Sequence, residues 1–290
     1  MVTDMVGSST NSNRGLASLP FLGVGLAFRQ ALEQQIWANQ ASVGWLEVTA
    51  EHYMSGLPEC MEALRKLLRA FPVIPHGIEL SIGSDGDLDC AYVTSLAKLI
   101  EEINAPWFSD HLCFTKAGGI ALGQLMPLPR TRECAMTVAR KAQSLQGEVG
   151  IPFLLENIAY YLDLPSELSE AQFISEVMEH CECGLLLDLT NVFINSLNHR
   201  FDTLVFVDSI PLERVVQIHL AGGEPSQAVF MDSHSAPVHE EVFGLLRYVS
   251  DRTPNLKGIS IERDGNFPAS FCELECDLEA AQKISAVLYG

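Results

Sequence analysis

The sequence predicts a single α/β domain folded as a (β/α)8 barrel, the TIM-barrel class. Eight short apolar runs recur at fairly even spacing, and longer amphipathic segments separate them, which is the pattern of repeated βα units. No linker or change of composition divides the chain into halves. With 290 residues and 48% hydrophobic content, the chain can bury one large core, and barrels of about this size form single domains.

The eight apolar runs give the expected strands, and the segments between them give the helices. We expect strands at 21–28, 43–52, 73–82, 107–115, 151–160, 184–192, 215–222 and 258–264. Apolar residues three or four positions apart predict helices, as at 58–71, 131–146 and 238–251. Residues 1–18 are rich in Ser and Asn, so we expect a disordered tail followed by a barrel domain over 19–290.

Composition excludes several kinds of partner and compartment. The formal net charge of -19 argues against nucleic acid or an anionic membrane as the main partner. The first residues lack the basic start and apolar core of a signal peptide, and no later run of eighteen apolar residues follows. We therefore expect a cytoplasmic protein whose eight cysteines are reduced thiols.

Polar residues that bind metals end almost every expected strand. In a barrel of this class the active site lies at the carboxyl ends of the strands. The residues that end the apolar runs are Glu47 and Glu51, His76, Asp110 and His111, Glu156 and Asn157, Asp188 and Asn191, His219, and Glu262 and Asp264. The loop after the seventh strand adds Asp232 and His234, which share one side of an extended segment. One such residue would be ordinary, but agreement among seven strand ends predicts a shared site.

The charges and ligand types indicate a metal centre. Carboxylates a few ångströms apart repel by about 1 to 4 kcal/mol per pair, and bound cations would reverse that sign. Imidazole and carboxylate together favour iron, manganese or zinc over copper(I). The nine candidate ligands are His76, His111, Glu156, Asp188, Asn191, His219, Asp232, His234 and Glu262. Nine exceed the six ligands of one octahedral ion, so we expect two or three ions, with Glu156 as a bridge. Cys113, two residues after His111, is a further candidate or a small core residue.

Seven motifs together resemble one known family. They are HGIELSIG (76–83), SDHLCFT (109–115), LLENIAYY (154–161), LLLDLTNVFINSLNH (185–199), QIHLAGG (217–223), MDSHSAPV (231–238) and SIERD (260–264). In order and spacing, over about residues 20–265, they resemble the multinuclear non-haem iron-dependent oxidative enzymes, a xylose-isomerase-like TIM-barrel family that includes the methanobactin-biosynthesis oxidase. The resemblance implies two or three iron ions, mixed ferrous and ferric, that use O2 to modify cysteine or another residue of a ribosomally synthesised precursor peptide. It also implies a small partner protein that presents the peptide.

The resemblance assigns roles to individual residues. It makes all nine candidates metal ligands, with Glu156 the bridging glutamate, and it places His111, Glu156 and Asp188 at the catalytic centre. Two departures stand out, because many members read AENY where this chain has His52 in place of the Asn, and HLAGH where this chain has Gly223. The second departure removes a polar side chain near the pocket, and His52 is a candidate replacement.

Three other interpretations remain open from the sequence. Xylose-isomerase-like sugar isomerases and epimerases also end strands in Glu, Asp and His, but they usually place a lysine in the pocket, and no lysine ends a strand here. A zinc phosphodiesterase resembling endonuclease IV is disfavoured by the acidic charge. A metal-binding scaffold without turnover is the non-catalytic alternative.

Overall fold

Eight parallel strands close into one barrel, as the sequence predicts. The computed structural model describes residues 15–162, 164, 166–226 and 229–289. Going round the barrel, the strands are β1 (Gly23–Ala27), β2 (Leu46–Thr49), β3 (Val73–His76), β4 (Phe108–His111), β7 (Phe153–Glu156), β8 (Gly184–Asp188), β9 (Val215–Ser226) and β11 (Gly258–Glu262). Pairing of β11 with β1 completes the ring.

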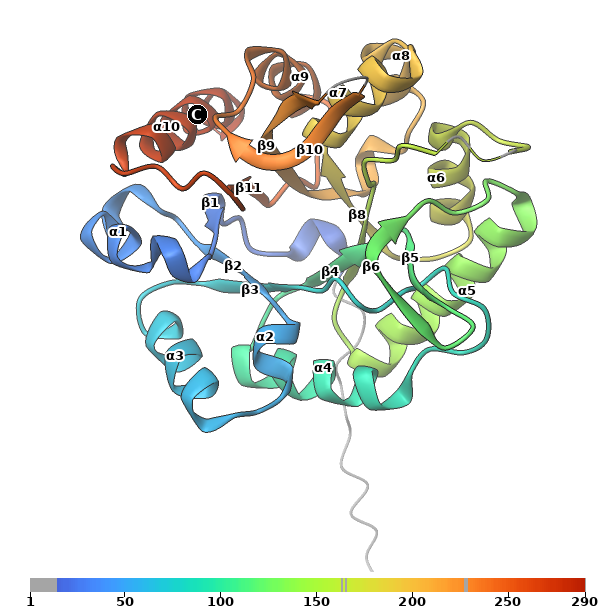
Figure 1. Ribbon diagram of the computed structural model, residues 1–290, viewed down its shortest axis with the longest axis horizontal. Helices are drawn as coiled ribbons and strands as arrows, with labels where there is room; N and C mark the ends of the chain where they lie inside the picture. The colour runs from blue at the N-terminus through green and yellow to red at the C-terminus, as the bar shows by residue number, and fades with distance from the viewer. Residues whose placement is uncertain (1–14, 163, 165, 227–228, 290) are drawn as a thin grey trace, which may run out of the picture.

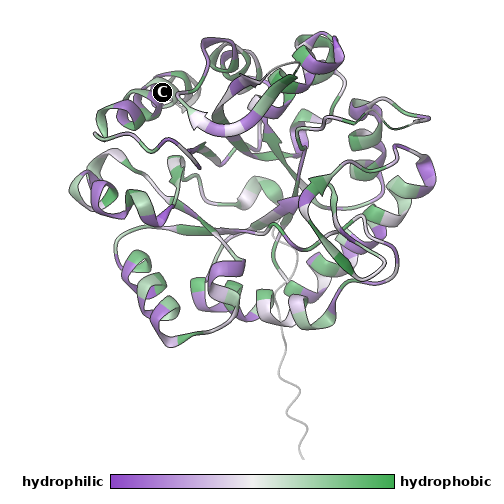
Figure 2. Cartoon of the chain, in the orientation of Figure 1, coloured by the Kyte–Doolittle hydropathy of each residue, from purple (hydrophilic) through white to green (hydrophobic). Residues whose placement is uncertain are grey.

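Helices surround the strands (Figure 1). They are α1 (Glu33–Ala38), α2 (Glu51–Met54), α3 (Pro58–Leu68), α4 (Cys90–Ile103), α5 (Arg132–Val149), α6 (Glu170–Glu179), α7 (Leu189–His199), α8 (Thr203–Asp208), α9 (Glu240–Ser250) and α10 (Cys272–Tyr289). Short 3-10 turns are η1 (Leu16–Ser18), η2 (Gln30–Leu32), η3 (Gln40–Ser42) and η4 (Leu212–Arg214). Hydrophilic and hydrophobic segments alternate along the helices in Figure 2, as expected where one face packs on the barrel.

Local sequence signals fix the ends of the long helices. The Thr131 side chain accepts a hydrogen bond from the backbone N–H of Cys134 at the start of α5, and the left-handed Gly150 ends that helix. At the start of α6, Ser169 and Gln172 form a reciprocal capping box. The cap at Thr131 coincides with the start of the helix that the sequence predicts at 131–146.

An apolar floor closes the barrel below the strand ends. It contains Trp45, Ile74, Trp107, Leu154, Leu186 and Val216. Side chains two positions apart on a strand point to the same face, so the residues two positions after Trp45, Ile74, Leu154 and Leu186 also point inward. Those residues are Glu47, His76, Glu156 and Asp188. The alternation that builds the floor therefore places polar side chains directly above it.

Several strands are shorter than the apolar runs suggest. The run 107–115 divides into β4 and a separate strand β5 (Phe114–Ala117), which pairs with β6 (Ile120–Met126) in a two-stranded sheet of its own. The run 184–192 ends as a strand at Asp188, because the Asp188 carboxylate accepts the backbone N–H of Asn191 at 2.7 Å and starts α7. Asn191 therefore lies in the first turn of a helix and not on a strand.

The segment after β9, which the sequence predicts to be a loop, forms a strand. β10 (Val229–Ala236) pairs antiparallel with β9, and its register shifts between Met231 and Ala236. His234 lies inside that irregular stretch with a positive φ of 46°. The bulge redirects side chains locally, so simple two-residue alternation does not by itself explain how Asp232 and His234 meet.

The chain before the barrel is only partly described. Residues 1–14 of the expected tail lie outside the described residues, whereas Leu16 of η1 packs against the barrel floor. Among the residues that the structure describes, no helix is both long and apolar enough to cross a membrane.

We expect Gly25→Ala to destabilise the barrel. A Cβ atom at Gly25 would lie 2.5 Å from the carbonyl oxygen of Trp45 and 2.6 Å from its ring, so the buried ring would have to move, at a cost of about 1 to 3 kcal/mol. Gly147→Ala on α5 is the matched control, because a Cβ atom added there would meet nothing within 4 Å and alanine favours helix by about 0.5 to 1 kcal/mol. Urea unfolding measures both, and equal stability of the two variants would contradict this packing.

Candidate metal centre

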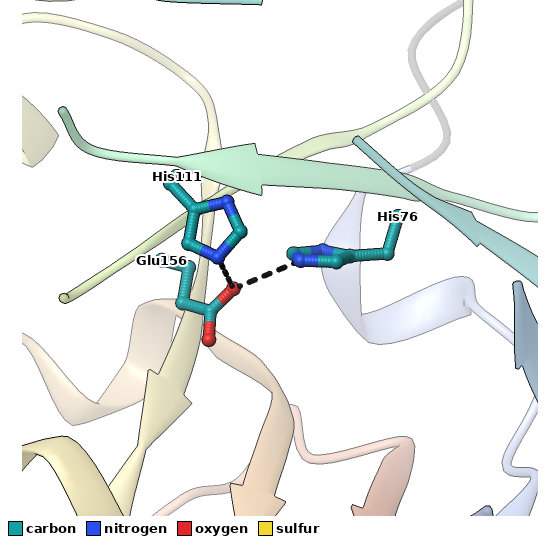
Figure 3. Close-up of side chains that lie close together, drawn as sticks. All are labelled: His76, His111 and Glu156. Carbon is teal, nitrogen blue, oxygen red and sulfur yellow. Dashed lines mark ion pairs between the residues drawn. The ribbon is translucent and has the colours of Figure 1, made fainter. Parts of the chain in front are cut away.

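Glu156 is the meeting point of three histidines at the carboxyl end of the barrel. The Nε2 atoms of His76 and His111 each lie 3.3 Å from Glu156 Oε2 (Figure 3). On the other side, His219 Nδ1 lies 3.1 Å from Glu156 Oε1. Strand register explains the meeting, because His111 pairs with Glu156 across β4 and β7, and Asp188 pairs with His219 across β8 and β9.

Two groups of side chains have the geometry to hold a metal ion. The first is His76, His111 and Glu156, and the second is Glu156, Asp188, His219 and Glu262. Within each group the potential ligand atoms lie within 4.8 Å of one another. Glu156 belongs to both groups and has one oxygen toward each, which is the arrangement that a bridging carboxylate needs.

The β9–β10 hairpin brings two more predicted residues to the same mouth. His234 Nε2 lies 2.7 Å from Asp232 Oδ1, and His234 Nδ1 lies 3.6 Å from Glu262 Oε2. The hydroxyl of Tyr161, in the loop after β7, accepts the backbone N–H of Asp232 at 2.8 Å. Tyr161 thus ties the hairpin to the loop that follows the Glu156 strand.

Hydrogen bonds behind the site turn the free oxygens of Asp188 and Asn191 toward it. The Asn191 amide nitrogen donates to the carbonyl oxygen of Asn157 at 3.1 Å. This hydrogen bond fixes the orientation of the amide group and leaves Asn191 Oδ1 free. Asp188 Oδ1 caps α7, and Asp188 Oδ2 is free. His76 is oriented in a similar way, because its Nδ1 bonds Ser109 Oγ at 2.8 Å and its Nε2 faces Glu156.

Buried atoms without hydrogen-bond partners gather among the predicted ligands. In the described part of the chain, Asp188 Oδ2 and Asn191 Oδ1 have none, and Glu156 Oε2 forms no hydrogen bond although the Nε2 atoms of His76 and His111 lie 3.3 Å away. Asp232 Oδ1 and His234 Nε2 lie 2.7 Å apart and pair with each other. Buried polar atoms are normally paired, and leaving one unpaired costs about 1 to 3 kcal/mol. Carboxylate and amide oxygens beside imidazole nitrogens are a donor set that suits a hard or borderline divalent cation. The residues present therefore fit a bound metal.

The charges of the site act strongly on one another. Burial raises the pKa of Glu156, but the charges of His111, His219 and His76 outweigh it and lower that pKa to about 2. Burial also raises the pKa of Asp188, and the charges of Glu156 and Asp232 raise it further. The raised pKa of Asp188 favours a proton on its carboxyl group when no metal is bound, which reduces the negative charge of the site.

The histidines next to several carboxylates show this effect of charge most clearly. Burial lowers the pKa of His219, but Glu262, Glu47 and Glu156 outweigh it and hold that pKa well above the usual value. The same opposition raises the pKa of His234, where Asp232 and Glu262 supply the charge. His76 faces fewer carboxylates, and burial lowers its pKa.

Two residues that the ligand set leaves out contact it directly. Glu47 Oε1 lies 2.9 Å from His219 Nε2, inside the barrel. Glu47 is among the strand-end residues that the sequence predicts at the mouth, but it is not one of the nine candidate ligands. Arg29, in the loop after β1, lies 3.6 Å from Glu262 and pairs with Asp264, which in turn lies 3.2 Å from His234. No strand pattern marks Arg29, so the sequence offers no comparable signal for it.

A second layer fixes the loop that follows His76. The Glu51 carboxylate accepts the backbone N–H groups of Ile78 and Glu79 at 2.7 and 2.8 Å, and the Tyr92 hydroxyl donates to it at 2.6 Å. Asp110 is buried beside it, and burial raises the pKa of Asp110 to about 7. Glu51 and Asp110, two of the predicted strand-end acids, therefore hold backbone and do not join either ligand group.

Three other sequence candidates lie apart from the ligand groups. Burial raises the pKa of the Cys113 thiol well above its usual value, and the nearby carboxylates add to the effect, which fits a core thiol. His52 is exposed on α2. Gly223 has no room for a side chain, since a Cβ there would lie 2.5 Å from the carbonyl oxygen of Met231. The exposure of His52 gives no support to its expected role as the replacement for the family histidine.

A closed parallel barrel with histidines and carboxylates at its mouth defines the class of TIM-barrel enzymes able to hold metal ions. Within that class, the chain belongs to the family described as RiPP precursor modification enzyme MbnB/TglH/ChrH, whose model matches residues 23–286. RiPP denotes a ribosomally synthesised and post-translationally modified peptide. The match confirms the family resemblance read from the seven motifs, and it makes the protein a peptide-modifying enzyme by family.

Individual relatives agree with the family match. A UPF0276 protein of Anaeromyxobacter sp. is 34% identical over 248 residues, which cover 85% of this chain and 87% of the relative. A UPF0276 protein of Streptomyces avermitilis is 32% identical over 277 residues, but the chain spans only 56% of its length. Among solved structures, D-psicose 3-epimerase from Clostridium cellulolyticum H10 has a TM-score of 0.57 at 10% identity, covering 92% of this chain and 99% of the epimerase. That likeness concerns the fold alone.

We expect the metal-free protein to lose stability as the pH rises above about 6.5. His219 and His234 have raised pKa values in the fold, so their stabilisation is complete below the unfolded pKa and is lost as the pH rises through the folded values. Each such histidine contributes a slope of up to about 1.4 kcal/mol per pH unit. Urea unfolding with a chelator between about pH 6.5 and 9 measures the slope. His180→Ala, at an exposed site on the barrel exterior, should leave it unchanged, and a flat profile for the wild type would contradict the expected charge balance.

Proposed function

We propose that this protein is a multinuclear non-haem iron oxidase that uses O2 to modify cysteine, or another residue, of a ribosomally synthesised precursor peptide. The observation that carries the proposal is the pair of ligand groups that share Glu156, with unpartnered buried oxygens on Asp188 and Asn191, in a chain that belongs to a peptide-modifying family. Bound iron would supply redox chemistry with O2 and a Lewis acid for the substrate.

The chain's own residues divide into two proposed iron sites and a third set on the hairpin. His76 and His111 would hold one ion with Glu156, and Asp188, His219 and Glu262 would hold a second ion with the other Glu156 oxygen. Asn191, Asp232 and His234 supply the remaining donors. We place His111, Glu156 and Asp188 at the catalytic centre, because Glu156 joins the two groups and the other two lie on either side of it.

The buried floor of the barrel leaves the carboxyl end of the strands as the side from which substrate can reach the site. The floor of Trp45, Trp107 and their neighbours is fully buried, so the substrate must enter from the mouth. We propose that a small partner protein presents the precursor peptide there and that the reaction takes place in the cytoplasm. The epimerase alternative has less support, since among the residues that the structure describes Arg29 lies beside Glu262, whereas sugar epimerases of this fold usually place a lysine in the pocket.

We expect protein purified without oxygen to contain two or three irons per chain and to consume O2 with a cysteine-containing precursor peptide. His111→Ala and Asp188→Ala should each lose iron and turnover, because each removes a ligand from a different group. His180→Ala is the matched control and should keep both. Metal analysis, O2 uptake and mass spectrometry of the peptide measure the outcome.

Two results would contradict this proposal. One is iron content and product yield that survive either substitution. The other is protein that carries zinc or manganese and no iron, which would return the choice to an epimerase-like enzyme or a scaffold.

A further inference from the structure

A buried polar chain lies directly under the proposed metal centre. It runs from Trp107 through Gln217 and Glu47 to His219, and each of these side chains is at most 2% exposed. None of the first three belongs to the proposed ligand set. Buried polar groups of this kind are kept where they fix the geometry of something else, and here the neighbour is His219.

The Trp107 end of the chain fixes the orientation of the Gln217 amide. Trp107 Nε1 donates to Gln217 Oε1 at 2.8 Å. An indole N–H can only donate, so the amide oxygen must face Trp107. The amide nitrogen of Gln217 must then face the other way, where it donates to Glu47 and lies 3.0 Å from His219 Nε2.

The Glu47 carboxylate then fixes the proton on His219. The Gln217 amide nitrogen is a donor, so among the three side chains Gln217, Glu47 and His219 the carboxylate of Glu47 is the acceptor. Its two oxygens lie 2.9 and 3.1 Å from His219 Nε2. With a metal ion bound on the Nδ1 side, the proton of a neutral His219 would sit on Nε2 and point at Glu47. The Nδ1 atom lies 3.1 Å from both Glu156 and Glu262, the carboxylates that share its ligand group.

We propose that Glu47 is a positioning residue that holds His219 in the Nε2–H form, so that Nδ1 is the metal-binding atom. The inference rests on the proposed metal centre and adds which ring nitrogen binds and which buried chain selects it. A carboxylate that accepts the distal N–H of a metal-bound histidine fixes the tautomer and raises ligand basicity, and losing it typically weakens metal binding about 10- to 100-fold.

The first test identifies the tautomer directly with zinc, a diamagnetic probe. Two-bond ¹H–¹⁵N correlation spectra of the zinc-loaded protein, labelled with ¹⁵N-histidine, should show His219 with a protonated Nε2 and a metal-bound Nδ1. Comparison with His219→Ala assigns its signals. Zinc bound through Nε2 would overturn this inference alone, whereas failure of zinc to bind at all would overturn the metal centre beneath it.

The second test separates positioning from simple structural support. Glu47→Gln should weaken zinc binding about 10- to 100-fold, and it should move the Nε2–H proton resonance of His219 upfield in the zinc-loaded protein, because a neutral amide oxygen is a weaker acceptor than a carboxylate. A merely structural role would weaken zinc binding without moving that resonance, and that result would overturn the proposal. Asp277→Asn, which removes a buried carboxylate bonded to the backbone N–H of Val238 at 3.2 Å, should leave zinc affinity unchanged.

A rescue variant completes the design. The double variant Glu47→Gln with Gln217→Glu returns a carboxylate to the neighbour that lies 3.0 Å from His219 Nε2. It should restore the Nε2–H signal and most of the zinc affinity. A folded double variant that binds zinc as weakly as Glu47→Gln would overturn the role assigned to the carboxylate.

Discussion

The convergence of carboxylates and imidazoles on Glu156 is the constraint on which the rest of the site depends. Closure of the barrel places β3, β4, β7, β8, β9 and β11 around one axis, and the two-residue alternation of each strand then turns one polar side chain inward at the same height. Three of those side chains are histidines within 3.3 Å of a Glu156 oxygen. In the absence of a metal, the surrounding carboxylates hold the pKa values of His219 and His234 well above the usual value, so protons on these two rings offset part of the negative charge.

That electrostatic requirement explains why hydrogen bonds fix the orientation of so many side chains around the centre. The amide of Asn191, the imidazole of His76 and one oxygen of Asp188 each form one hydrogen bond away from the centre, which leaves the opposite atom facing inward. Glu51 and Asp110 use their charge on backbone N–H groups instead. The mouth thus contains two kinds of acid, those with free oxygens and those already satisfied, although both kinds end apolar runs in the sequence.

The fold and most of the cluster could be predicted from the sequence, because both follow from short-range periodicity. Alternating apolar runs identify strands, and the rule that barrel sites lie at strand ends then selects His76, His111, Glu156, Asp188 and His219. The errors arise where a local hydrogen bond overrides the pattern. Asp188 caps α7 and so moves Asn191 from a strand to a helix, and antiparallel pairing with β9 makes the expected loop around His234 into β10. Arg29 could not have been found, since its partners Glu262 and Asp264 lie more than 230 residues away along the chain.

The β9–β10 hairpin is where this chain departs from its family pattern, and packing explains why the departure is tolerated. Gly223 faces the Met231 carbonyl and the Phe230 ring so closely that no side chain fits. His239 reaches the same place from the start of α9, bonds the Gly223 carbonyl at 2.9 Å and packs against Phe193 and Phe230. An imidazole therefore still lies beside this hairpin, but it is bonded to backbone. Since Asp232 and His234 depend on the course of β10 for their position, a side chain at Gly223 would have to displace the hairpin that carries them.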